Sequence, residues 1–221
     1  MLESRVQSAR RTHFLLFTPV ICLWCGWILR RYARALRGVE IIGNGSGSHH
    51  ELRKLSTRME LMISATRKCG GVYLYSNQRG CDGGRTYYDG CAMIVVNGRI
   101  VAQAPQFDVH EVHVISATID LDDVRSYRAY NPAFGIQAAR MATDEGGAGR
   151  HGLPCNDIEL VFDSICQSST NTSRPKVSSE DLELRIASPE EECCLGSVLQ
   201  DWKKASCAPG LSLILITSFA A

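Results

Sequence analysis

The sequence lacks an excess of charge of either sign. Its 221 residues hold 24 Lys and Arg against 23 Asp and Glu, which gives a formal net charge of +1 at pH 7. Proteins that bind nucleic acids through a broad electrostatic footprint carry a basic excess. We therefore expect no nucleic-acid partner.

The sequence also lacks an apolar run long enough to cross a bilayer. Residues 14–28 (FLLFTPVICLWCGWI) are mostly apolar, but a membrane-spanning helix needs about 20 such residues. Arginines flank this run on both sides, so their positions indicate no orientation in a membrane. Residues 33–35 match the small-residue pattern of a signal-peptide cleavage site only formally. We expect a cytoplasmic protein without membrane association. A membrane-associated or exported protein is the alternative that this run leaves open.

Cysteine is plentiful, but its spacing lacks the order of a disulfide framework or a zinc site. The ten cysteines are scattered along the chain, and Cys22 and Cys25 form a lone CxxC without a second pair. His49 and His50 are adjacent, so their side chains point apart, and no third ligand follows at helical spacing. We therefore expect reduced thiols and no metal site.

Short apolar segments and one helical pattern occupy the middle of the chain. Apolar residues recur every three or four positions from Leu52 to Ile63, which predicts a helix over about 51–68 that stops at Gly70-Gly71. Asn97-Gly98 predicts the turn of a hairpin. Alternating or short apolar runs predict strands near 39–43, 72–76, 92–96, 100–104 and 112–121.

Two stretches lack such patterns. Residues 78–89 are polar and rich in glycine, which predicts a loop. Residues 129–178 are rich in Gly, Ser, Asn and Thr, which predicts a loosely packed linker. A helix that alternates with strands and precedes a hairpin indicates an α/β layered domain.

Four motifs resemble segments of the eukaryotic glutamine-dependent NAD synthetases. They read NGSGSHHELRK (residues 44–54), CDGG (81–84), YYDGC (87–91) and SPEEE (188–192). The glutaminase part of these proteins is a nitrilase-like carbon-nitrogen hydrolase domain, a four-layer α-β-β-α sandwich. The resemblance implies that residues 38–128 are a partial domain of this α/β fold, followed by an irregular C-terminal part.

The resemblance also divides the rest of the chain. It implies a divergent N-terminal segment with a short apolar run at 1–37, a linker at 129–185, and the vestige of a synthetase-domain start with a divergent tail at 186–221. SPEEE opens that domain in the family, but the nucleotide-binding SGGxDS does not follow here. The family uses ATP and magnesium in the synthetase domain, so we expect a fragment that holds no cofactor.

The catalytic residues of the family have no counterpart in this sequence. In the family a Cys thiolate attacks the glutamine carboxamide, a Glu acts as general base and a Lys stabilises the oxyanion. The Glu and Lys lie upstream of the matching region, and His13 stands at the aligned position of the nucleophile. Cys22 lies near the right distance from Gly38 but lacks the acid pair that follows the nucleophile. We therefore assign no catalytic residue.

Ser48 and Lys54 are the candidate site residues. The resemblance implies that both hold the glutamine substrate, because they match the serine after SG and the basic residue six positions on. A hydroxyl and a cation suit the polar groups of an amino acid. A purely structural interpretation is that Ser48 caps a helix beginning near His50 and that Lys54 is a solvated helix charge. Both interpretations can hold at once.

We expect a fragment of a glutamine-dependent NAD synthetase that is inactive by itself. The family hydrolyses glutamine and uses the ammonia for ATP-dependent amidation of deamido-NAD. The alternative is a non-catalytic interaction protein, because a sheet that lacks half its strands leaves edges for pairing. Its partner would be an intact homologue or a second copy in a homo-oligomer.

Overall fold

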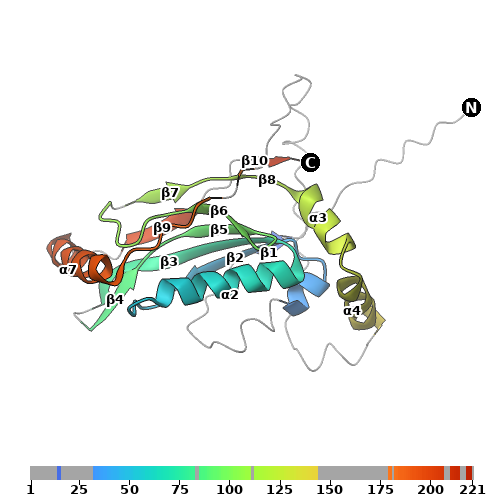
Figure 1. Ribbon diagram of the computed structural model, residues 1–221, viewed down its shortest axis with the longest axis horizontal. Helices are drawn as coiled ribbons and strands as arrows, with labels where there is room; N and C mark the ends of the chain where they lie inside the picture. Colours follow the sequence, from blue (N-terminus) through green and yellow to red (C-terminus); the bar gives the residue numbers. More distant parts are fainter. Residues whose placement is uncertain are drawn as a thin grey trace, which may run out of the picture.

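A computed structural model describes residues 14–15, 32–82, 85–110, 112–143, 179–180, 182–206, 210–214 and 218–220. A mixed sheet forms its centre, with helices on one face and at both ends (Figure 1). The strands of its main path are, in spatial order, β1 (Phe14–Leu15), β2 (Ile41–Ser46), β3 (Val72–Asp82), β5 (Met93–Val96) and β6 (Arg99–Gln103). The first three are parallel, and β5 and β6 continue antiparallel.

The second half of β3 extends the sheet in another direction. There β3 pairs antiparallel with β4 (Thr86–Asp89) and with β9 (Gly210–Ile214), and β9 pairs in turn with β7 (His113–Ile115). A separate two-stranded sheet joins β8 (Thr118–Asp120) to β10 (Ser218–Ala220). The mixed α/β class expected from the sequence is confirmed.

The helix α2 (Lys54–Cys69) covers one face of the sheet. Because side chains alternate along a strand, β3 and β5 turn one set of residues to α2 and the other set to the opposite face. The set facing α2 forms a buried cluster with the helix: Leu55, Met59, Met62, Tyr73, Tyr75, Cys91, Met93, Val95 and Ile100. The opposite set, with Val72, Ile94 and Val96, packs against buried residues of the segment 115–124. The sheet is thus buried on both faces.

The expected hairpin is confirmed at Asn97-Gly98. Both residues have positive φ, 49° at Asn97 and 85° at Gly98, as a type I′ turn requires. A Cβ at Gly98 would lie 2.9 Å from Cβ of Arg67 on α2. The turn therefore needs glycine both for its backbone angle and for its contact with the helix.

The expectation of one long strand over 112–121 is wrong. His113–Ile115 and Thr118–Asp120 belong to different sheets, and Ser116-Ala117 separates them. The strand also ends early, because Asp120 accepts a hydrogen bond from the backbone N of Asp122 (2.8 Å) and so caps α3 (Leu121–Ala129). An alternating pattern shows which side chains are buried, but it does not show which strand each half pairs with.

The expectation of a loop over 78–89 is also wrong. β3 continues to Asp82 and returns as β4, so that only residues 83–84 fall outside the described part of this hairpin. Polar side chains occupy these strands because several of them are paired inside the protein, as the site below shows. Polarity alone is therefore a poor sign of a loop here.

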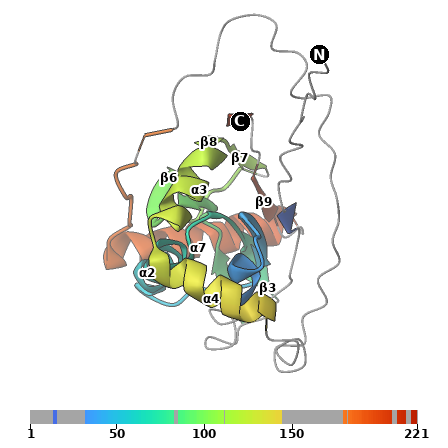
Figure 2. The same ribbon diagram turned by 90° about the vertical axis from the view of Figure 1, so that its right-hand side faces the viewer.

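Part of the predicted linker 129–178 is helical. The helix α4 (Pro132–Thr143) packs beside α3, and its buried Phe134 meets the Tyr32 ring edge-on and the Arg128 guanidinium at 5.3 Å. Figure 2 shows α3 and α4 on the same side of the molecule. Residues 144–178, on which the rest of that prediction falls, lie outside the described residues. The expectation of an irregular C-terminal part is corrected by an 18-residue helix, α7 (Pro189–Ser206).

Most of the apolar run 14–28, including Cys22 and Cys25, lies outside the described residues. Within the described part of the chain, no helix is both long enough and apolar enough to cross a membrane.

Candidate functional site

The candidate site is a loop of residues 47–53 between β2 and α2. It leaves β2 at the carboxyl end of that strand, where Ser46 pairs with Asn77 in the middle of β3. The buried Asn77 of β3 holds this loop: its side-chain Oδ1 accepts from the backbone N of Ser48 (2.9 Å), and its Nδ2 donates to the carbonyl of Ser48 (3.0 Å). The Ser48 hydroxyl takes part in neither bond.

A buried charge network lies beneath Asn77. Nδ2 of Asn77 also donates to Oδ1 of Asp89 (3.3 Å), and Asp89 forms an ion pair with Arg58 and accepts from Nε2 of Gln106 (3.1 Å). Arg58 donates in addition to the Tyr75 hydroxyl (3.2 Å). Asp89 is 0% exposed, and a buried charge is tolerable only when it is paired in this way.

The charges of this network alter the pKa values of its members. Burial by itself would lower the pKa of Arg58, but the Asp89 carboxylate and the Tyr75 hydroxyl together outweigh burial and hold that pKa above its ordinary value. Burial is the main reason why the pKa of the Tyr75 hydroxyl is raised. The network is therefore an Arg58–Asp89 ion pair with neutral hydrogen-bonding neighbours.

Lys54 stands at the far end of the loop as the first residue of α2. Its side chain is only 8% exposed, and its Nζ lies 3.1 Å from Oε1 of Glu51 and 3.4 Å from Nε2 of His49. The hydrogen bond from Lys54, followed by that from His49, lowers the pKa of Glu51. The Lys54 ammonium is thus folded back toward His49, the residue next to Ser48.

The structure contradicts two details of the purely structural interpretation, the helix cap at Ser48 and the solvated charge at Lys54. The helix begins at Lys54, and its N-cap is Arg53, which has φ of 64° and makes no side-chain cap hydrogen bond. Ser48 is therefore not the cap. Lys54 is buried and paired, so it is not a solvated helix charge.

Sequence reasoning missed Arg58, Asn77 and Asp89 as members of the site. Arg58 follows Leu55 by three positions and precedes Met62 by four, which puts it on the buried face. A charged residue at such a position signals a buried partner. Asp89 lies within the YYDGC motif, but nothing in the motif shows that its carboxylate meets Arg58.

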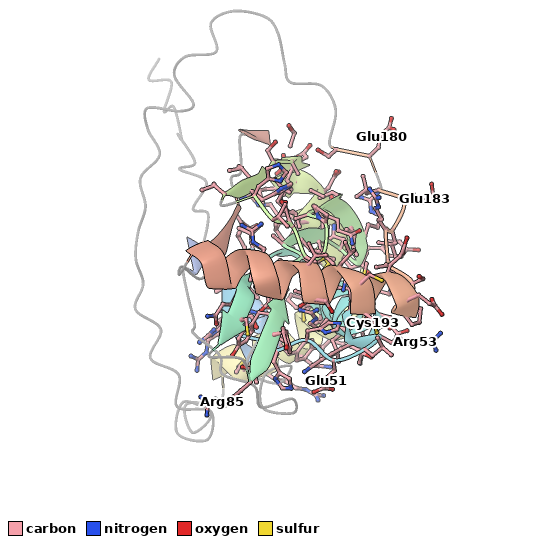
Figure 3. The ribbon with its side chains drawn as sticks, turned by 90° about the vertical axis from the view of Figure 1, so that its left-hand side faces the viewer. Glu51, Arg53, Arg85, Glu180, Glu183 and Cys193 are labelled. Atoms are coloured by element: carbon pink, nitrogen blue, oxygen red, sulfur yellow. The ribbon has the colours of Figure 1, made fainter. Side chains whose placement is uncertain are left out.

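A fourth missed residue, Glu192 of α7, closes the loop from outside. Its side chain is 1% exposed, and its Oε2 lies 3.1 Å from Nε2 of His50 and accepts from the backbone N of Arg53 (3.0 Å). The His50 ring also meets the Phe107 ring edge-on at 4.9 Å between centroids. Figure 3 shows α7 crossing the ends of the strands, with Cys193 on the same side of the molecule as Arg53.

Cys91 is a core thiol. It is buried next to β5, and burial raises the pKa of its thiol to about 12. A thiol with such a pKa carries almost no thiolate at neutral pH and is not a nucleophile. Cys193 and Cys194, in contrast, are exposed on α7.

We expect iodoacetamide at pH 8 to alkylate Cys193 and Cys194 in the folded protein while Cys91 stays unmodified. The reason is the combination of burial and raised pKa at Cys91. Peptide mass spectrometry after timed quenching measures the modified fraction of each cysteine. In guanidinium chloride all three should react at similar rates. Modification of Cys91 as fast as that of Cys193 under native conditions would contradict the buried placement.

A second charge cluster surrounds Asp108. Its Oδ2 lies 2.5 Å from Nδ1 of His113 and 3.4 Å from Nη1 of the buried Arg79, and its Oδ1 lies 2.6 Å from Nδ1 of His110. Burial pushes the pKa of Asp108 upward, but the backbone and ring N–H groups of His110 and the charge of Arg79 outweigh it, so the pKa is lowered. The described residues contain no group of three or more His, Cys, Asp or Glu side chains arranged to hold a metal ion.

Asp108→Asn is expected to destabilise the protein at pH 7 by about 1–3 kcal/mol, because the charged acceptor of several donors is lost. A lowered folded-state pKa means that Asp108 contributes this stability above its unfolded pKa of about 3.9 and loses it as the pH falls through the lower folded value. Urea unfolding of both proteins between pH 7 and pH 3 measures the difference, which should shrink only below about pH 4. A difference that is the same at every pH would contradict this assignment.

Comparison with known proteins places these features in context. The carbon-nitrogen hydrolase family model matches residues 4–129. The putative glutamine-dependent NAD(+) synthetase of Schizosaccharomyces pombe is 48% identical over 183 residues, which are 82% of this chain and 24% of that protein. The glutamine-dependent NAD(+) synthetase of Saccharomyces cerevisiae is 62% identical over 107 residues, which are 48% of this chain and 15% of that protein.

One solved structure, a glutamine-dependent NAD(+) synthetase from Cytophaga hutchinsonii, aligns with a TM-score of 0.34 and 26% sequence identity. The alignment covers 34% of this chain and 13% of that one. The chain spans a quarter or less of the length of the two curated relatives described above.

Proposed function

The chain belongs to the carbon-nitrogen hydrolase family, and from this premise we propose that residues 38–128 are part of a glutaminase domain whose loop 47–53, together with Lys54, binds glutamine. The relatives described above are named as glutamine-dependent NAD(+) synthetases. The proposed parent activity is the hydrolysis of glutamine, with the ammonia used for ATP-dependent amidation of deamido-NAD. In this proposal ATP and magnesium belong to a synthetase domain, of which residues 186–221 are the start.

The observation that carries the proposal is the state of Lys54. Its buried ammonium already binds a carboxylate, that of Glu51, whose own side chain is 60% exposed. An exposed carboxylate can rotate into the solvent at little cost in free energy, which leaves the ammonium free to bind another carboxylate. The α-carboxylate of glutamine is such a replacement, and a charge-assisted hydrogen bond in a shielded place is stronger than one at an open surface.

Ser48 supplies the second contact in the proposal. Asn77 fixes its backbone on both sides, so that the hydroxyl projects from a chain segment that is already ordered. A preorganised group loses less entropy when a ligand binds. Asp89, which is paired with the buried Arg58, accepts a hydrogen bond from Asn77 and so keeps the Asn77 side chain in the position that holds Ser48.

Glutamine binding to the purified chain tests the proposal. We expect weak but saturable binding by NMR titration, and we expect Ser48→Ala and Lys54→Met each to weaken it. Loss of a hydrogen bond to a charged group corresponds to about 10–100-fold in affinity for Lys54→Met. Lys68→Met is the matched control, because Lys68 lies exposed in the last turn of the same helix. Equal binding by Lys54→Met and Lys68→Met, or no binding by the unmodified chain, would refute the assignment.

A second candidate function is interaction with an intact homologue or with a second copy of this chain. The segment 182–186 runs beside β6, held by bonds from the backbone N of Leu182 to the carbonyl of Ile100 (3.0 Å) and between Gln103 and the backbone of Arg185. Three apolar residues alternate along it and are each more than 40% exposed: Leu182, Leu184 and Ile186. Sedimentation velocity of the chain, alone and mixed with the S. pombe relative, measures whether such a complex forms.

A further inference from the structure

The start of α7 is fixed in place by its own sequence. Oγ of Ser188 accepts from the backbone N of Glu191 (3.3 Å), and Oε2 of Glu191 accepts from the backbone N of Ser188 (2.8 Å). This reciprocal pair is a capping box, and Pro189 occupies the first helical position, where its missing N–H does no harm. The side chain of Glu192 therefore leaves the helix in one defined direction.

That direction leads into the protein. Glu191 and Glu190 are exposed, but Glu192 is buried between α7 and the loop 47–53, where it contacts His50 and the backbone of Arg53. Its second oxygen, Oε1, has no hydrogen-bond partner among the described residues. Burial of a carboxylate is costly, and the contacts with the loop are what offset that cost.

The loop needs such an external contact. Arg53 adopts a left-handed conformation, with φ of 64°, which costs a residue with a side chain about 1–2 kcal/mol. Its N–H points to Glu192 Oε2. This bond holds the turn that directs Lys54, the next residue, into its buried position at the start of α2.

We infer that Glu192 is a positioning residue for the candidate glutamine-binding loop, and that α7 acts through it as a clasp that sets the affinity of the loop for glutamine. The inference rests on the proposed function for its ligand. Glu192 acts through His50 and Arg53, which it contacts directly and which lie between Ser48 and Lys54 in the chain. Undocking of α7 removes the acceptor of the Arg53 N–H and releases the turn.

Amide hydrogen exchange at Arg53 tests the clasp directly. In the full chain, Glu192→Ala is expected to speed exchange of the Arg53 amide by about tenfold or more, because its acceptor is gone. Glu192→Gln keeps a neutral acceptor of the same shape and should restore part of the protection. Glu191→Gln is the matched control, because it removes the same charge from the same turn and a glutamine still completes the capping box.

Glutamine affinity, measured by NMR titration of the same variants, tests the positioning role. We expect Glu192→Ala to weaken binding at least fivefold, Glu192→Gln to weaken it less, and Glu191→Gln to leave it unchanged. Unchanged exchange at Arg53 in Glu192→Ala would overturn the clasp even if glutamine binds as proposed. Faster exchange with unchanged affinity would overturn the positioning role alone. Failure of the unmodified chain to bind glutamine would overturn the proposed function, and with it the role of Glu192 in glutamine binding.

Discussion

Asp89→Ala is expected to lower the free energy of unfolding by about 3–5 kcal/mol, a large share of the stability of an ordinary domain. The substitution leaves the Arg58 guanidinium buried without its counter-charge, and it removes an acceptor from both Asn77 and Gln106. Urea unfolding followed by circular dichroism measures the change. Glu60→Ala is the control, because Glu60 is exposed on α2, and it should change stability by less than about 0.5 kcal/mol.

A double substitution separates the effect on stability of losing the Arg58–Asp89 ion pair from the effect of losing side-chain packing. Arg58→Met with Asp89→Leu removes both charges, so no buried charge is left unpaired. We expect this double variant to be more stable than Asp89→Ala alone, although it loses more polar contacts. If the changes in unfolding free energy caused by Arg58→Met alone and by Asp89→Leu alone add up to the change in the double variant, the ion pair is not the reason for the lost stability.

The second large effect concerns catalysis: this chain, expressed alone, is expected to show no appreciable glutaminase activity and to make no NAD. A nucleophile, its base and its oxyanion-stabilising group act as one unit, and loss of a member costs about 10³–10⁶-fold in rate. By resemblance, no residue of this sequence stands for the Glu, the Lys or the Cys of that unit. Cys91 offers no substitute, because it is buried and its thiol pKa is raised to about 12.

Release of labelled ammonia from isotope-labelled glutamine, and NAD formation with deamido-NAD, ATP and magnesium, measure the two activities. The S. cerevisiae relative, which is named a glutamine-dependent NAD(+) synthetase, is assayed in parallel as the positive control. Glutamine hydrolysis by this chain that disappears in Cys22→Ala or Cys25→Ala would contradict the prediction. That result would show that residues near position 20 provide a working nucleophile.

Local patterns predicted the elements whose partners are close in sequence. The helix after residue 50, the strands β2, β3, β5 and β6, and the Asn97-Gly98 hairpin all follow from periodicity and turn chemistry. The region 112–121 was misread because its two halves pair with β9 and β10, far along the chain. A pattern of burial contains no information about which distant strand provides the hydrogen bonds.

The candidate site was predicted in its residues but not in its construction. Ser48 and Lys54 were proposed from a motif, and their role in binding glutamine stays a prediction. Their supports depend on contacts between distant segments: Asn77 with Ser48, and Glu192 with Arg53. Arg58 was the one support with a local signal, since its position coincides with the apolar face of α2. A charge on a buried helix face indicates that a partner exists, but only the fold shows that the partner is Asp89.

The long strand β3 has a consequence for how the protein folds. Its first half pairs with β2 and β5, which are its neighbours in the chain, whereas its second half pairs at Gln78 with Leu211. During synthesis the first half can pair with β2 and β5 early, but the edge at Gln78 stays without this partner until residue 211 has left the ribosome. Contacts of such high sequence separation form late, and an unpaired edge that persists meanwhile attracts other strands. The yield of native protein should therefore depend on whether the unpaired edge of β3 is protected from other strands until Leu211 can pair with it.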